Sequence, residues 1–293
     1  MHATIDAYLD SLKTALQGSD AALVQDALAD AREHLSLALQ AAREKDPTAD
    51  EARALAGIIE AYGSPEETAA AYREVERRTA PALERPLKTR SAFGRFLEVY
   101  TDPRAWGGLF YMLIASLTGV FYFSWAVTGF AVSVSFLILM IGLPVALLFL
   151  LSIRGLALLE GRLVEALLGV RMPRRPLFSN PNLRWLDRLQ ALVTDRTTWR
   201  MLGYMVAQFV SGIVYLVLLT VVLAFTLSLL GLPIIQQLTG QGVIVMGTTR
   251  YTVPLWSYPL WMLGGALLWT IFMNVARGIG QLHGRYARWM LIA

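Results

Sequence analysis

The pattern of hydrophobic and polar positions changes near residue 104. Before it, charged and apolar side chains mix at helical spacing. After it come three runs without a charged residue, at 105–153, 201–249 and 251–276. A helix that crosses a bilayer needs roughly 20 apolar residues, so these runs are too long for a soluble core. They predict four membrane-spanning helices, over about 107–128, 131–153, 201–225 and 255–276.

The first 78 residues have the pattern of four short helices. Helical periodicity covers about 4–16, and a cap at Ser19 or Asp20 opens a helix that runs to about Lys45. A capping box at 48–51 opens the third helix. Between the third and fourth helices, Gly63 can take a left-handed conformation, Ser64 can cap, Pro65 suits the first helical position, and Glu66 and Glu67 complement the helix dipole.

Two segments of this region carry a family resemblance. Residues 61–72 read Ala-Tyr-Gly-Ser-Pro-Glu-Glu-Thr-Ala-Ala-Ala-Tyr, and residues 30–35 read Asp-Ala-Arg-Glu-His-Leu. Over residues 4–76 the chain resembles the HAAS-type cytoplasmic domains. The resemblance implies a signalling or protein-interaction module at 1–78 whose partner is a transcription regulator or a kinase. Within it, His34 is either a phospho-acceptor or ligand or, more simply, a partly buried histidine beside Leu35.

The membrane part contains an internal repeat. Residues 101–106 align with 194–199, and each segment places an aspartate four residues before a tryptophan. Later matches pair Gly142-Leu143-Pro144 with Gly231-Leu232-Pro233 and Arg154-Gly155 with Arg277-Gly278. Both repeats start and end on the same side, so we predict two parallel tandem repeats, about 95–170 and 186–292.

Each predicted repeat has an amphipathic segment before its two spans and another after them. The second amphipathic segments, 156–170 and 279–292, suit the inner leaflet surface. The second repeat also carries an insert at about 234–254 with strand-like residues 243–245. We expect an extracytoplasmic hairpin, with a re-entrant segment as the alternative.

The repeat unit resembles the four-span sensor domain of actinobacterial membrane proteins. The residues that carry this resemblance are those at 102–106, 142–144 and 154–162, and it covers about 95–290. It implies a membrane-sensing role without identifying a ligand. The predicted fold class is therefore all-α: a small helical domain at 1–78, a linker and amphipathic leading segment at 79–100, and a four-helix transmembrane domain at 101–293.

Composition and charge place the chain in a membrane. Only 16% of its residues are charged, against about 25% in soluble domains, and its net charge is +4. The arginines gather beside the apolar runs, and Arg250 alone lies on the opposite side. By the positive-inside rule both termini are cytoplasmic, which predicts a multi-pass protein of the bacterial inner membrane. Direct nucleic-acid binding is not expected, since no basic recognition helix is present.

The sequence lacks the usual elements of catalysis. It has no cysteine, and its three histidines lie far apart at 2, 34 and 283, so neither thiolate chemistry nor a metal site is expected. The predicted spans hold no ionisable residue, which disfavours a proton relay. Gln208 and Asn274 are better explained as polar contacts between helices. We expect no cofactor and no enzymatic activity.

Several residues could still bind ligands or stabilise the fold. Arg154, Arg162, Arg277 and Arg285 either contact lipid headgroups or only fix the topology. Asp102 and Asp195 are helix caps or partners of neighbouring arginines. An aromatic set forms an interfacial belt or a hydrophobic ligand groove under the insert: Trp256, Tyr258, Trp261 and Trp269. The structural signature residues are Gly63, Ser64, Pro65, Glu66, Asp102, Trp106, Gly142, Pro144, Asp195, Trp199, Gly231 and Pro233.

These patterns favour a membrane sensor or regulator that couples a membrane or envelope signal to a cytoplasmic partner through residues 1–78. The alternatives are an accessory subunit of a membrane complex such as an exporter, and a protein that binds lipid or a hydrophobic ligand. The lipid bilayer is a partner in every case, and a homo-oligomer is possible in each.

Overall fold

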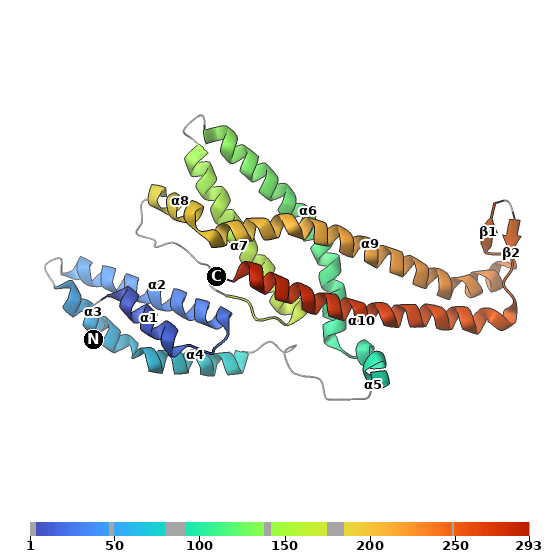
Figure 1. Cartoon of the computed structure of the whole chain (residues 1–293), viewed down its shortest axis with the longest axis horizontal. Coiled ribbons are helices and arrows are strands. Elements are labelled where there is room, and N and C mark those ends of the chain that lie inside the picture. Colours follow the sequence, from blue (N-terminus) through green and yellow to red (C-terminus); the bar gives the residue numbers. More distant parts are fainter. Residues whose placement is uncertain are drawn as a thin grey trace. The chain divides into compact units, whose positions relative to one another are not determined.

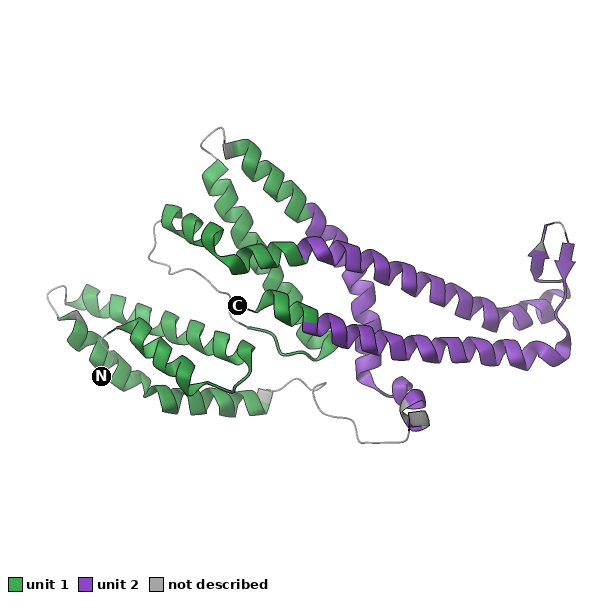
Figure 2. Ribbon diagram, in the orientation of Figure 1, with its two compact units in different colours: residues 1–84, 125–204, 286–293 green, residues 85–124, 205–285 purple. Residues whose placement is uncertain are grey.

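The computed structural model describes residues 4–46, 50–79, 92–137, 142–174, 185–247 and 249–292. Helices dominate these ranges, and one short hairpin holds the described strands, which confirms the all-α prediction. The chain forms two compact units, residues 1–84, 125–204 and 286–293 in unit 1, and residues 85–124 and 205–285 in unit 2 (Figure 2). Residues 80–91, which hold most of the predicted linker, lie outside the described ranges.

Four helices at the N-terminus form a small bundle, as predicted (Figure 1). They are α1 (Ile5–Ala15), α2 (Ala21–Lys45), α3 (Glu51–Tyr62) and α4 (Pro65–Thr79). Every third or fourth residue faces inward, and the resulting core consists of Tyr8, Leu9, Leu12, Leu16, Ala27, Ala31, Leu35 and Ala69.

Polar caps define the ends of these helices. Asp20 caps α2 and Asp50 caps α3, each by accepting a backbone N–H two residues ahead. Thr48 of the predicted capping box lies outside the described residues, and Asp50 caps the helix instead. Gly63 follows α3 with φ 109°, a conformation that other residues rarely adopt. At the start of α4, Ser64 and Glu67 bond reciprocally, which is the capping-box geometry.

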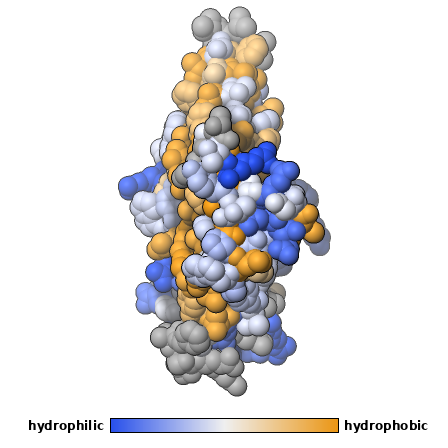
Figure 3. Space-filling model, turned by 90° about the vertical axis from the view of Figure 1, so that its right-hand side faces the viewer, coloured by the Kyte–Doolittle hydropathy of each residue, from blue (hydrophilic) through white to orange (hydrophobic). Residues whose placement is uncertain are grey.

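Four of the described helices are long and apolar enough to cross a membrane. They are α6 (Pro103–Leu137), α7 (Gly142–Leu168), α9 (Arg196–Thr239) and α10 (Tyr258–Leu291). The chain is thus a multi-pass membrane protein with the predicted number of spans. Apolar residues cover much of the surface in Figure 3, as lipid-facing helices require.

The helices exceed the predicted spans, and the predicted position of the first turn was wrong. Helix α6 continues through residues 129–130 to Leu137, and Gly142 opens α7. Gly142 and Pro144 therefore lie at a helix start, where proline loses no internal hydrogen bond. In contrast, Pro233 lies inside α9, close to its end.

The predicted second amphipathic segments are not separate helices. Residues 156–168 belong to α7 and residues 279–291 to α10, without a break from the preceding span. Helix α9, with 44 residues, is about 66 Å long, more than twice the roughly 30 Å hydrocarbon core. The segments before the spans do form short separate elements: α5 (Ala92–Leu97) with η2 (Glu98–Tyr100), and α8 (Trp185–Thr194).

The predicted insert is part helix and part hairpin. Residues 234–239 complete α9, and β1 (Ile244–Met246) pairs antiparallel with β2 (Thr249–Tyr251), with Val245 opposite Arg250. The short helix η3 (Leu255–Ser257) then leads into α10. The side-chain amide of Gln236 binds both backbone polar groups of Val253, at 2.7 and 2.8 Å, and so holds the end of the insert against α9.

Candidate functional site

Asp102 stands at the start of α6 and makes two kinds of contact. One oxygen accepts the Arg104 N–H at 3.0 Å and caps the helix. The other accepts from Arg277 of α10 at 3.2 Å, and the side chain is 1% exposed. Both sequence-based interpretations of Asp102 therefore hold, but the paired arginine lies 175 residues away in the chain and is not a neighbour.

Asp195, the repeat equivalent of Asp102, has the same two contacts. It caps α9 through the Thr197 N–H at 3.0 Å and pairs with Arg154 of α7. Arg154 is 6% exposed and also donates to the Thr198 hydroxyl at 3.0 Å. Each aspartate thus binds the arginine of the other predicted repeat.

The repeat-equivalent tryptophans also make equivalent contacts. Trp106 donates its indole N–H to the Tyr100 carbonyl at 3.0 Å, and Trp199 donates to the Val193 carbonyl at 2.7 Å. Trp106 is 39% exposed and Trp199 is 45% exposed, which fits indoles at a membrane–water interface.

Helices α6 and α9 touch through glycine. A Cβ on Gly119 would lie 2.6 Å from the Gln208 carbonyl oxygen, and a Cβ on Gly212 would lie 2.6 Å from that of Ala115. Gly119 and Gly212 are equivalent positions of the repeat, so the contact is reciprocal. Backbones approach this closely only where the side chain is absent, as in many membrane helix pairs.

A buried polar cluster lies in unit 2. His283 of α10 is 4% exposed, and its two ring nitrogens bond the hydroxyls of Tyr111, at 2.7 Å, and Tyr215, at 2.8 Å. The Gln208 amide donates to Tyr111 at 3.1 Å. Gln208 therefore serves as the predicted contact between helices, with a histidine in the same network.

In unit 1, the residues equivalent to Tyr111 and His283 are Tyr204 and Glu160. The Tyr204 hydroxyl donates to the buried Glu160 carboxylate at 3.0 Å. Neither Glu160 nor His283 was expected to make a buried polar contact. The spacing that pairs Arg154 with Arg277 also pairs Glu160 with His283, so the repeat itself contained the signal.

An ion-pair network, which we call the Arg171 joint, connects the N-terminal bundle to the segment after α7. It consists of Arg171, Arg174, Asp26, Glu76 and Glu165. Arg171 donates to Glu76 of α4 at 2.6 Å and to Asp26 of α2 at 3.0 Å, while its side chain is 5% exposed. Arg174 binds Glu165 at 2.8 Å through its side chain and Asp26 at 2.7 Å through its backbone N–H.

The electrostatics of the joint favour the charged arginine. Burial by itself lowers the pKa of Arg171. The hydrogen bond and charge of Glu76, with the charges of Asp26 and Glu165, outweigh burial and raise that pKa. A second ion pair, Arg288 to Asp20 at 2.7 Å, joins the end of α10 to the start of α2.

The family comparison decides what the membrane part is. Residues 111–291, more than half of the chain, match the model of a family described as “Putative sensor”. The chain belongs to this sensor family. Neither the curated proteins nor the solved structures contain a match. The match begins after Trp106 and covers no part of the N-terminal bundle, so the HAAS resemblance stays a prediction.

Within this sensor-family chain, the four arginines with a predicted lipid contact fall into two groups. Arg154 forms an ion pair with Asp195, and Arg277 forms one with Asp102. Arg285 is exposed, and Arg162 is about half exposed with Glu165 at 3.8 Å. Exposure leaves Arg162 and Arg285 as the better candidates for contact with lipid headgroups.

The aromatic residues predicted to line a groove spread along η3 and α10. Trp256 is 75% exposed, Tyr258 and Trp261 are half-buried, and Trp269 packs against Phe272 in the core of unit 2. Eleven residues separate Tyr258 from Trp269, which is about 16 Å along a helix. A groove that includes Trp269 would therefore be long and partly filled.

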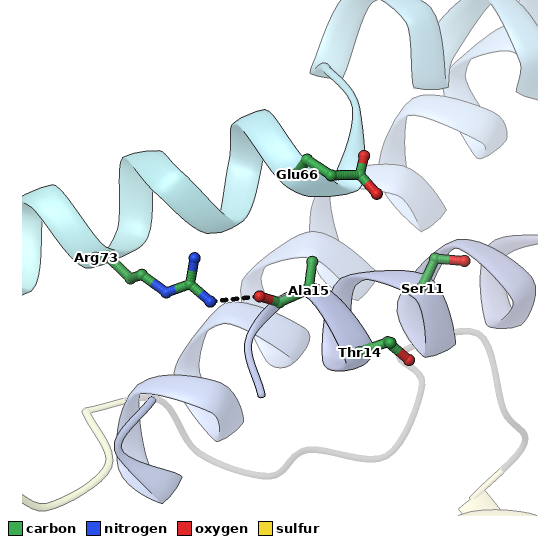
Figure 4. A pocket seen from close by; sticks show the side chains of 5 residues that line it. All are labelled: Ser11, Thr14, Ala15, Glu66 and Arg73. Carbon is green, nitrogen blue, oxygen red and sulfur yellow. Dashed lines mark hydrogen bonds between the residues drawn. The ribbon is translucent and has the colours of Figure 1, made fainter. Parts of the chain in front are cut away.

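A hollow lies between α1 and α4 of the bundle. Ser11, Thr14, Ala15, Glu66 and Arg73 line the hollow (Figure 4), and Arg73 donates to the Ala15 carbonyl at the end of α1. That contact satisfies a helix terminus and so explains the arginine structurally.

His34 differs from its simpler prediction. It is exposed and stacks on Tyr62 with ring centroids 4.8 Å apart, so it is not buried beside Leu35. Nearby, Tyr72 donates to Asp30 at 2.5 Å, and burial together with that carboxylate raises the pKa of Tyr72.

Proposed function

We propose that this protein is a membrane sensor that passes a membrane or envelope signal to a cytoplasmic protein through its N-terminal bundle. The sensor family supports the first half of the proposal. In the proposed topology the protein lies in a bacterial inner membrane, both termini are cytoplasmic, and the partner is a transcription regulator or a kinase. We propose further that the chain regulates and does not catalyse.

The Arg171 joint is the observation that carries the coupling. It ties α2 and α4 of the bundle to the end of α7 through a guanidinium group with almost no solvent contact. Loss of one partner from a buried ion pair costs about 3–5 kcal/mol. We propose that the joint has two states, closed and broken, and that these two states provide the coupling between distant sites.

The test is site-directed cross-linking in native membranes. A photoreactive amino acid replaces Leu37, which is 51% exposed on α2, and captured proteins are identified by mass spectrometry. We expect one dominant cytoplasmic partner, and we expect Arg171→Ala to change its yield. Arg196→Ala is the control, because Arg196 is an exposed arginine that takes no part in the Arg171 joint.

Other outcomes would favour other functions. Capture of exporter subunits at fixed stoichiometry would make the chain an accessory subunit. A signalling output that survives deletion of residues 1–78 would overturn the proposed coupling. Specific turnover by purified protein in liposomes, abolished by one substitution, would show an enzyme or a transporter.

A further inference from the structure

The segment that follows α7 binds the bundle in the manner of a peptide ligand. Residues 169–174 have no regular secondary structure, and Gly169 ends α7 with φ 69°. Pro173 cannot continue a helix and favours an extended residue before it. Even so, Arg171, Met172 and Pro173 are all buried. Three consecutive buried residues in an irregular segment point to a specific seat.

The bundle supplies the polar part of that seat. The Asp26 carboxylate accepts from the Arg171 guanidinium with one oxygen and from the Arg174 backbone N–H with the other. Glu76 accepts from the Arg171 Nε at 2.6 Å. A side-chain guanidinium and a backbone N–H are features that any extended arginine-containing peptide can present. We call the surface formed by Asp26 and Glu76 the acidic seat.

The remaining attachment of the segment belongs to α7 and not to the bundle. Glu165 accepts from Arg174 at 2.8 Å, and the Met172 side chain packs against Gly161. Residues 169–174 are therefore bound both to α7 and to the acidic seat. Movement of α7 would withdraw the segment from the seat and leave two carboxylates without their buried partner.

We propose that the acidic seat is the docking surface for an extended, arginine-containing segment of the protein partner, and that residues 169–174 occupy it in cis. Charge complementarity argues for this occupant, because two carboxylates on adjacent helices suit a guanidinium with one bond to each. The partner binds when the sensor releases its own segment. This inference rests on the proposed function for its biological role, though not for its binding chemistry.

Occupancy in cis predicts weak binding in trans. A surface that is free only about one-tenth of the time binds a ligand about tenfold more weakly than a surface that is always free. The probe is a fluorescein-labelled peptide with the sequence of residues 168–174, Leu-Gly-Val-Arg-Met-Pro-Arg. Its affinity for the full-length protein in detergent is measured by fluorescence anisotropy.

We expect Arg171→Ala to bind the peptide at least about tenfold more tightly than the wild type. Adding Asp26→Asn should abolish that gain, and a peptide with alanine in place of its first arginine should not bind. Arg171→Gln is a second opening variant, which removes the charge that the acidic seat binds but keeps a polar side chain and leaves the bundle unchanged. It serves if circular dichroism shows that Arg171→Ala is unfolded. Equal binding by wild type and both opening variants, or binding that does not need Asp26, would overturn the proposal.

The two proposals fail in different experiments. If the peptide behaves as expected but cross-linking captures no cytoplasmic partner, the proposed function fails and the acidic seat stands. If cross-linking captures a partner whose yield is unchanged by Asp26→Asn, and no variant binds the peptide, the seat fails and the proposed function stands.

Discussion

The glycine contact between α6 and α9 makes the most direct quantitative prediction. Gly119→Ala adds one methyl group at a point where its carbon would lie 2.6 Å from the Gln208 carbonyl oxygen and 3.2 Å from the Phe209 Cα. Both neighbours are backbone atoms, which cannot turn away as the tip of a side chain can. The two helices must therefore separate, or bend, to accept the change.

The cost follows from the size of that separation. Ordinary contact begins near 3.4 Å, so the helices must part by roughly 0.8 Å, and a gap of that size forfeits a quarter to a half of each dispersion contact across it. Overpacking of this kind costs about 1–3 kcal/mol. The better helix propensity of alanine returns up to about 1 kcal/mol. We expect a net loss of about 1–2 kcal/mol.

Thermal unfolding of the full-length protein in detergent, followed by tryptophan fluorescence, measures this loss. For a chain of this size we expect the Tm to fall by about 2–6 °C. Gly278→Ala is the control, because no atom lies within 4 Å of its added Cβ. Gly212→Ala should resemble Gly119→Ala, and the double variant should cost less than the sum, since the first change already parts the helices. Equal Tm values for Gly119→Ala and Gly278→Ala would refute the reasoning.

Three further predictions concern polar groups. Asp195→Asn keeps the cap but removes the negative charge that Asp195 presents to buried Arg154. We expect the free energy of unfolding to fall by about 2–3 kcal/mol, a figure reduced because the aspartate is 32% exposed. An unchanged Tm would contradict this. Ser64→Ala should cost about 1 kcal/mol. Hydrogen bonds from Ser64 lower the Glu67 pKa. Part of the stability difference between the wild type and Ser64→Ala should therefore disappear as the pH falls below 4.5, which circular dichroism can follow. Burial and the hydrogen bond to Asp30 raise the Tyr72 pKa, so the unfolded chain ionises first and the protein loses stability as the pH rises above 10. Tyr72→Phe should lose less stability over the same pH range. Ultraviolet absorbance of tyrosinate follows the ionisation.

Local signals account for much of what could be predicted. The capping at Ser64, the left-handed Gly63 and the apolar face of α2 depend on residues within one or two turns, so sequence alone located the four bundle helices. The charge-free runs likewise predicted four spans, because the bilayer requires length and apolarity and little else.

The helix ends in the membrane part were harder to predict. The turn was expected near Gly129, yet α6 continues past it, because that glycine makes room for Phe149 instead of a bend. The sequence does not distinguish a glycine in a turn from a glycine at a close packing contact, because the difference depends on the residues that surround it in space.

By itself, the sequence determined the number of spans, the bundle helices and the equivalence of Asp102 with Asp195. Only the tertiary structure decided which charges meet. Arg277 binds Asp102 across 175 residues, and Arg171 reaches Asp26 across 145. Ion pairs form where folding brings two charged groups within a few ångströms of each other. For residues this far apart in the chain, sequence spacing does not predict which groups will meet.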